Sequence, residues 1–137
     1  MAEDCIFCKI VRRQAPSSIV YEDEKILAFV DIRPVSEGHT LVIPKRHCVD
    51  VFDTPNELLA ATYIVTKQVA AAVKKATDAG GISVVQQNGK AAGQDIFHMH
   101  VHVIPRFEGK KMPHFNHLAV VSREELDAVA IRIKTEL

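Results

Sequence analysis

Five short runs of mostly apolar residues punctuate this chain, and each run predicts a β-strand. They are rich in β-branched and aromatic residues, which favour strands over helices. Asp23-Glu24 is expected to turn the chain between the first two runs, and Pro105 to stop the last one, because proline cannot donate to a sheet ladder. The five runs are residues 19–22, 25–31, 39–44, 81–88 and 98–104.

Apolar residues recur at helical spacing in three other segments. A short helix is predicted over residues 5–13, ended by Pro16. A long helix is predicted to begin at the capping box of residues 54–57 and to end near residue 79, before Gly80-Gly81. The last helix follows a second capping box at residues 122–125. Its expected buried stripe is Leu126, Val129, Ile133 and Leu137.

These elements indicate an α+β domain with a five-stranded antiparallel sheet, two main helices and a short N-terminal helix. The connections between most strands are too short for parallel crossovers. Residues 107–121 are predicted to form a surface segment. At 137 residues, with no linker or repeat, the chain is expected to be one domain over residues 1–137.

The composition of the chain limits the classes of partner and the cell compartment that we expect. The chain has 17 basic and 17 acidic residues, which argues against a protein dedicated to binding nucleic acid or a membrane surface. No apolar stretch reaches the length of a membrane span, and the acidic start resembles neither a secretory signal nor a transit peptide. Three cysteines suit a reducing compartment. We therefore expect a cytoplasmic protein, with the nucleus as a second compartment.

Candidate chemistry concentrates in residues 98–104, HMHVHVI, where His98, His100 and His102 alternate with apolar residues. In a strand these three rings share one face and lie roughly 6.6 Å apart, from a rise of about 3.3 Å per residue. That spacing lets one phosphate contact two rings. A glycine-containing loop at residues 88–95 precedes the run and has the composition to wrap an anion. The histidine face is therefore predicted to open onto a cleft.

This run resembles the signature of the histidine triad (HIT) family of nucleotide hydrolases and transferases. Other stretches are similar to that family in the same order, so the resemblance covers most of residues 5–106. It is strongest to the small single-domain branch that includes purine nucleoside phosphoramidases, in its form with an N-terminal CxxC. The stretches are CIFCKI at 5–10, LAFVDI at 27–32, LVIPKRH at 41–47 and residues 93–106.

The resemblance implies that His100 is a nucleophile that attacks the α-phosphorus, and that two such domains pair into a homodimer with a continuous sheet. The sequence pattern also favours His100 as the nucleophile, because only the middle ring of the three has a histidine on both sides. Neutral imidazole can attack phosphorus near pH 7 and form a covalent nucleotidyl-histidine. His98 and His102 are expected to orient the nucleophile and to contact phosphate oxygens. No organic cofactor is expected.

The nucleoside is expected to be held by residues that match family positions. Asp31 matches a carboxylate that accepts hydrogen bonds from both ribose hydroxyls. The apolar base slot would be Ile6, Phe7, Ile10, Phe29 and Ile32, which without the resemblance would be interpreted as ordinary core. The phosphate contacts are expected from Asn88, Gly93, Gln94 and Asp95, partly through backbone N–H groups.

Asp95 departs from the family pattern, which has serine or threonine at that position. A carboxylate there repels an anionic substrate unless it is protonated or turned away. The departure leaves the backbone donor in place but puts substrate preference and leaving-group protonation in doubt.

Cys5 and Cys8 form a CxxC motif that has three interpretations. Cysteines at i and i+3 share a helix face, so they can simply pack. A redox pair normally follows a strand, and none is predicted here. The third is a structural zinc site, which needs two more ligands. The resemblance implies that these are His47 and His98.

The remaining histidines and cysteine are assigned less specific positions. Cys48 is predicted to be a packed thiol, while His39, His114 and His117 are expected on the surface or in loops. Arg106 is a solvated charge that could draw in a phosphate.

The leading hypothesis is hydrolysis of nucleoside 5′-phosphoramidates or related conjugates at the α-phosphorus. The alternatives are a dinucleoside polyphosphate hydrolase and a nucleotide-binding regulatory or scaffold protein with vestigial activity. A protein that handles metal through the three alternating histidines fits worst, because their spacing is too wide for one ion.

Overall fold

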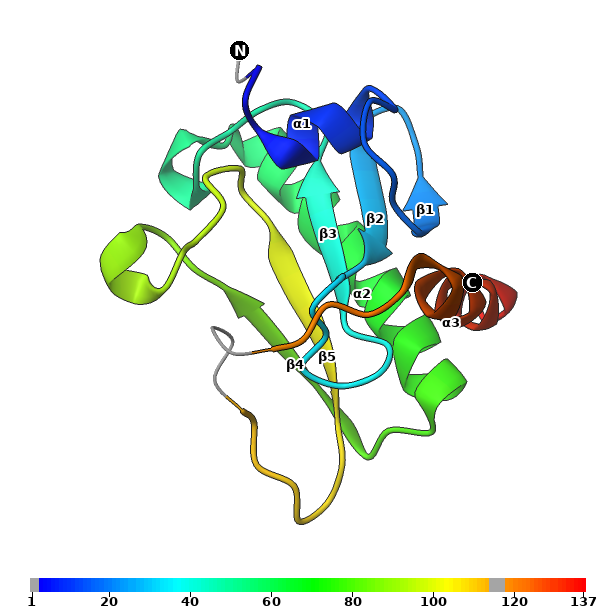
Figure 1. Ribbon diagram of the computed structural model, residues 1–137. Coiled ribbons are helices and arrows are strands. Elements are labelled where there is room, and N and C mark those ends of the chain that lie inside the picture. Colours follow the sequence, from blue (N-terminus) through cyan, green and yellow to red (C-terminus); the bar gives the residue numbers. More distant parts are fainter. Residues whose placement is uncertain (1–2, 114–117) are drawn as a thin grey trace.

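A computed structural model describes residues 3–113 and 118–137 of the protein (Figure 1). Its centre is one antiparallel sheet of five strands in the order β1-β2-β3-β5-β4. The predicted α+β class and strand count are therefore confirmed. The strands are β1 (Ile19–Glu22), β2 (Ile26–Val30), β3 (Thr40–Pro44), β4 (Gly81–Gln86) and β5 (Val101–Arg106).

The central strands are buried on both faces, which explains their almost continuous apolar sequence. In β2, Ile26, Ala28 and Val30 join the larger apolar core, while Leu27 and Phe29 point to a second cluster on the other face. Alternate residues of a strand point to opposite sides, so one strand supplies both cores. The sheet therefore needs a covering element on each face.

Helices cover the two faces unequally (Figure 1). The long helix α2 (Asn56–Thr77) packs on β3 and β5, and α3 (Arg123–Thr135) packs on β1 and β2. Of the described α-helices, the short helix α1 (Ile6–Val11) is the one on the opposite face, and its Phe7 and Ile10 pack in the second cluster. This thinner cover leaves room for a site on the α1 face.

Both ends of α2 differ from the sequence prediction. The hydroxyl of Thr54 donates to the carbonyl oxygen of Asp50 at 2.7 Å, so the expected capping box does not form there, and Pro55 is the N-cap. At the other end the left-handed residue is Asp78, with φ of 55°, and the helix ends at Thr77, before the glycines. By contrast, the Ser122 hydroxyl caps α3 as predicted, accepting from the Glu125 N–H at 3.3 Å.

The histidine strand begins later and ends later than predicted. It starts at Val101, because the Met99 N–H donates to the carbonyl of Cys48 at 2.6 Å outside the sheet ladder. His98 and His100 therefore precede the strand. Pro105 lies inside it, contrary to expectation, at a point where β3 pairing has already ended at Val103. A strand partnered on one side only tolerates a residue without an N–H.

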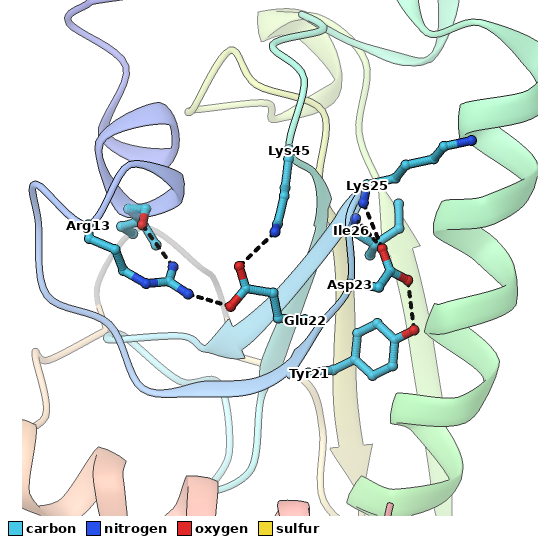
Figure 2. A network of polar contacts seen from close by, with 8 residues as sticks. Arg13, Tyr21, Glu22, Asp23, Lys25, Ile26 and Lys45 are labelled. Atoms are coloured by element: carbon cyan, nitrogen blue, oxygen red, sulfur yellow. Dashed lines mark hydrogen bonds and ion pairs between the residues drawn. The ribbon is translucent and has the colours of Figure 1, made fainter.

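A polar network fixes the start of the sheet beside α1 (Figure 2). Glu22 at the end of β1 accepts from Arg13, which follows α1, and from Lys45 Nζ at 2.6 Å, just after β3. Asp23 accepts from the N–H groups of Lys25 and Ile26 at 2.7 and 2.8 Å, which closes the predicted turn between β1 and β2. The contact between Arg13 and Glu22 therefore ties the segment after α1 to β1, and the Asp23 contacts hold β1 and β2 together.

The last segments agree with the sequence in outline. Leu126, Val129 and Ile133 of α3 are buried as predicted, whereas Leu137 lies beyond the helix and is 49% exposed. Among the described helices, none is long and apolar enough to cross a membrane.

Candidate active site

A cavity of about 430 Å³ lies on the α1 face of the sheet. Residues of α1, β2, β3, β5, the loop before β5 and the start of α3 line it. Most predicted nucleoside and catalytic residues converge here from segments far apart in the chain. They are Ile6, Phe7, Ile10, Phe29, Asp31, Ile32, Asp95, His100 and His102.

The apolar part of the cavity is a slot between α1 and β2. The rings of Phe7 and Phe29 meet edge to face with centroids 5.4 Å apart. Ile6 and Ile32 are each 43% exposed, so they stand at an opening that a planar group can enter. Phe7 also meets the ring of His100 with centroids 5.2 Å apart. The slot therefore leads directly to the predicted nucleophile.

Asp31 stands at the end of β2, where the slot meets the histidines. Its Oδ1 accepts from the Arg33 N–H at 2.9 Å, and its Oδ2 is 3.5 Å from His39 Nε2. Burial raises the pKa of Asp31 to about 6, while the Arg33 N–H opposes the rise. At neutral pH the side chain is still an anionic acceptor, as the ribose role requires.

A backbone carbonyl sets the tautomer of His100. Its Nδ1 is 2.7 Å from the carbonyl oxygen of His98, and because that oxygen can only accept, Nδ1 carries the proton. Nε2 is then unprotonated and has a lone pair. Burial lowers the pKa of His100, so the ring stays neutral at pH 7. His100 thus has the protonation state of a nucleophile.

His39 lies in a loop, which is one of its two predicted positions, but it is buried and lines this site instead of the surface. It lies just before β3, is 1% exposed, and accepts from the Val35 N–H at Nδ1 over 3.0 Å. Its Nε2 therefore carries the proton and donates to His102 Nδ1 at 2.9 Å. His102 in turn must carry its proton on Nε2. The register of the sheet brings the two rings together, because Leu41 of β3, two residues after His39, pairs with His102 of β5.

Burial keeps this pair of rings neutral. It lowers the pKa of His39 to about 3 and that of His102 to about 4, with the neighbouring histidines adding to the effect. The ring centroids of His100 and His102 are 4.9 Å apart, closer than the roughly 6.6 Å expected for an extended strand. A neutral donor therefore stands next to a neutral nucleophile.

The loop before the histidines is held by its own amides. Gln94 is buried, donates to the carbonyls of Val49 and Ile96 at 2.7 and 3.1 Å, and accepts from the Gly89 N–H at 2.7 Å. Asn88 accepts from the Val51 N–H at 2.8 Å. Neither side chain lines the cavity, so their role as phosphate contacts stays a prediction.

The expected backbone donors of this loop are also engaged. The N–H groups of Gly93 and Gln94 donate to the carbonyls of Lys90 and Gly89 at 3.0 and 3.1 Å. Gly93 has φ of +94°, and an added Cβ would lie 2.7 Å from the Gln87 side chain, so glycine is required there. Asp95 is the loop residue that reaches the cavity.

A second cluster adjoins the first through His98. Cys5, Cys8, His47 and His98 each direct one ligand atom to a common point, and all four atoms lie within 4.8 Å of one another. The Nε2 of His98 lies 2.7 Å from the carbonyl oxygen of Pro44, so this nitrogen carries the proton and Nδ1 presents its lone pair to the thiols. Cys5 also caps α1.

The separations fit a tetrahedral zinc ion. The Nδ1 atoms of His47 and His98 are 3.3 Å apart, Cys8 Sγ lies 3.3 and 3.5 Å from these two atoms, and Cys5 Sγ lies 3.5 Å from that of His98. Bonds of about 2.0–2.3 Å from zinc place tetrahedral ligands roughly 3.3–3.8 Å apart. Burial raises the pKa of Cys8, so without a metal that residue stays a thiol. The residues present therefore suit zinc, with all four positions filled by protein.

The remaining candidate residues lie in different places relative to the cavity. Arg123 of α3, which the sequence did not single out, lines the cavity and donates to Ser18 at 2.7 Å. Cys48 is buried in the main core as predicted. Arg106 donates to Ser83 at 3.2 Å and does not line the cavity. His114 and His117 lie outside the described residues.

Comparison with known proteins agrees with this geometry. Residues 12–109 match the model of the HIT domain. A HIT-like protein involved in cell-cycle regulation from Bartonella henselae is 40% identical, with a TM-score of 0.91 over 98% of this chain and 97% of that one. A Zn-bound histidine triad family protein from Mycobacterium smegmatis is 38% identical, with a TM-score of 0.87 over 99% and 94%. Adenylylsulfatase HINT3 of Arabidopsis thaliana is 42% identical over 79% of this chain and 55% of that protein.

Proposed function

This chain belongs to the histidine triad (HIT) family, and on that premise we propose that it hydrolyses nucleoside 5′-phosphoramidates or related nucleotide conjugates at the α-phosphorus. The observation that carries the proposal is the cavity in which an apolar slot and Asp31 lead to His100 with Nε2 unprotonated. The similarity to HINT3, named an adenylylsulfatase, supports nucleotide hydrolysis in general.

The first step is attack of His100 Nε2 on phosphorus. A nitrogen–phosphorus bond forms to the ring while the bond from phosphorus to the leaving amine breaks. The electron pair of that bond stays on the amine nitrogen, which takes a proton from water at the open end of the cavity. The Nδ1–H of His100 donates to the His98 carbonyl and stabilises the positive charge that develops on the ring.

The second step is hydrolysis of the nucleotidyl-histidine. Hydroxide left by the first proton transfer attacks phosphorus, the bond to His100 breaks, and a nucleoside monophosphate leaves. One water molecule is consumed overall. His102 presents an Nε2–H to the phosphate oxygens, because His39 occupies its Nδ1. Such preorganised donors are worth on the order of 3 kcal/mol each in the transition state.

Zinc would be held by Cys5, Cys8, His47 and His98 and would have a structural role. Four protein ligands leave no open position for water or substrate. The ion would fix α1, which forms one wall of the base slot, and His98, whose carbonyl sets the tautomer of the nucleophile.

We further propose one domain per chain and a homodimer. Strand β4 is at the edge of the sheet, and its Val84 is 48% exposed. On α2, Ile64 is also exposed, at 61%. A second copy could cover both. Sedimentation equilibrium should give twice the mass of the chain.

The activity is tested with purified protein and a panel of adenosine and guanosine phosphoramidates, dinucleoside polyphosphates and adenylyl sulfate. Release of the nucleoside monophosphate from phosphoramidates supports the proposal. Faster turnover of dinucleoside polyphosphates would favour the alternative hydrolase. Binding of nucleotide without turnover of any substrate would favour a regulatory protein.

A further inference from the structure

Asp95 brings a carboxylate into the catalytic cavity, at its open end. It follows the buried Gln94, and it lines the cavity together with His100 and His102. Asp95 is exposed to solvent, whereas the Asp31 side chain is only 18% exposed. The two acidic residues therefore stand at different depths of the same cavity.

The charge of Asp95 acts on groups deeper in the cavity. Burial lowers the pKa of His102, and the negative charge of Asp95 opposes that change. Burial raises the pKa of Asp31, and the same charge adds to the rise. Electrostatic interactions weaken with distance, so the Asp95 carboxylate acts on the part of the cavity that Asp31 and His102 also line.

Among the described residues, the arginines that line the cavity are Arg33 and Arg123, and neither forms an ion pair with Asp95. Arg123 is held at the other end by Ser18, beside the lining residues Ala15, Pro16 and Ser17. Arg33 lines the cavity next to Asp31 and lowers the pKa of that residue. The open end near the histidines therefore has an anionic wall at Asp95.

We infer that Asp95 selects substrates by the charge of the leaving group, favouring amines with a cationic end and disfavouring leaving groups with an anionic end. The inference rests on the proposed function. Nucleophile and leaving group lie on opposite sides of phosphorus in an in-line displacement. With the nucleoside in the buried slot, the rest of the conjugate must extend towards solvent, past Asp95.

The side-chain chemistry supports this selection. An ionised carboxylate accepts hydrogen bonds and repels anions, whereas the hydroxyl usual in the family is neutral and can also donate. An ammonium group passing Asp95 would be attracted, and a phosphate, sulfate or carboxylate would be repelled. Asp31 does not duplicate this effect, because it is directed at the ribose.

The test uses three adenosine 5′-phosphoramidates that share one phosphorus–nitrogen bond. Their leaving amines are of equal length and end in an ammonium, a methyl or a carboxylate group. We expect kcat/KM of the wild-type protein to fall in that order. Asp95→Asn removes the charge at nearly constant shape and should reduce the ammonium-to-carboxylate ratio about two- to fivefold, the range of an exposed charge pair. Asp95→Glu should keep most of the ratio.

Two controls make the result specific to this position. Glu57→Gln changes the net charge equally but lies on the exposed first turn of α2, away from the cavity, and should leave the ratio unchanged. In the wild-type protein, raising the salt concentration from low values to 0.5 M should reduce the ratio by screening. The salt measurement keeps the inference testable if a variant folds poorly.

Two outcomes separate the inference from the function beneath it. If all three compounds are hydrolysed with a ratio near one, or if Asp95→Asn leaves the ratio as it is, Asp95 does not select the leaving group although the proposed function stands. If none of the compounds is hydrolysed while nucleotide binds, the proposed function fails first.

Discussion

At the scale of single residues, backbone groups define the chemistry of the histidines. The carbonyls of Pro44 and His98 accept hydrogen bonds from His98 Nε2 and His100 Nδ1. The Val35 N–H donates to Nδ1 of His39 and so fixes the tautomer of that ring. Each ring is thereby left with one nitrogen of known protonation for zinc, substrate or a neighbouring ring. Side-chain identity alone would leave these tautomers open.

Asp31 is predicted to hold the ribose. Asp31→Ala should weaken the binding of a nucleoside monophosphate by about 1.5–3 kcal/mol, the range for hydrogen bonds to a charged group. Titration calorimetry with ribo- and dideoxyribonucleotides measures the effect. The wild-type protein should prefer the ribonucleotide, and Asp31→Ala should lose that preference. Equal wild-type affinity for both sugars would contradict the role.

At the residue level, the sequence motifs indicated residues that the fold brings together around one cavity. The apolar slot and Asp31 line the cavity as the family resemblance implied. His39 was assigned elsewhere because it stands alone in the sequence. It becomes a site residue only when β3 pairs with β5, a contact between positions 63 residues apart. The sequence did not indicate Arg123 as a cavity residue for the same reason, since α3 reaches the cavity through tertiary packing alone.

At the scale of elements, α1 depends on its contacts. It has 6 residues, too few to be stable as an isolated helix. Phe7 and Ile10 anchor it to the sheet, and Cys5 and Cys8 contact His47 and His98 in the proposed zinc site. Loss of either anchor should therefore loosen the wall of the base slot.

Zinc removal tests this dependence. A chelator should lower Tm by roughly 10 °C, as expected for an ion bound well above its Kd, and should reduce initial turnover at low temperature much less. Because the thiols must lose their protons to bind, affinity should fall as pH falls. Elemental analysis of untagged protein should give one zinc per chain. Less than about a tenth of an equivalent, unchanged in a Cys5→Ser, Cys8→Ser double variant, would reduce the CxxC to packing.

Gly38, which precedes the histidine at the start of β3, is required by its surroundings. It has φ of +104°, and an added Cβ would lie 2.6 Å from Thr77 Cγ2 of α2. Gly38→Ala should lower the free energy of unfolding by about 2–3 kcal/mol in urea titrations, through backbone strain and overpacking. Gly109→Ala is the matched control, since Gly109 has φ of +78° with nothing within 4 Å. Equal losses in both variants would show that the Thr77 contact has no effect.

Element boundaries were less predictable than element types. The capping box at residues 54–57 has the right residues, but the helix begins one residue later with Pro55 as its N-cap, and the Thr54 hydroxyl donates to the carbonyl of Asp50. The histidine run alternates as a strand does, yet a hydrogen bond to Cys48 draws Met99 away from the ladder. The partner of Met99 is distant in the sequence, so the local pattern of the histidine run could not indicate where the strand begins.

At the scale of the whole molecule, burying histidines links stability to pH. The pKa of His39 is lowered from about 6.5 in the unfolded chain to about 3. Its neutral form is favoured in the fold, so its contribution to stability is complete above pH 6.5 and is lost as pH falls towards 3. Asp31 acts in the opposite direction, because its pKa is raised to about 6 and its protonated form is favoured in the fold.

The expected effect is measurable. Between pH 7 and pH 5, His39 should cost the wild-type protein about 2 kcal/mol of unfolding free energy. In His39→Gln the decrease over this range should be smaller by that amount. Urea titrations at the two pH values provide the comparison. An identical decrease in both proteins would mean that His39 is protonated in the fold at pH 5.

The proposed mechanism requires His100 to be the nucleophile. Mass spectrometry of protein quenched rapidly during turnover measures this directly, by locating a nucleotidyl adduct. We predict the adduct on His100, and we predict that His100→Asn loses both adduct and turnover while it still binds nucleoside monophosphate in the slot beside Phe7 and Asp31. An adduct on another residue, or full turnover by His100→Asn, would contradict the mechanism.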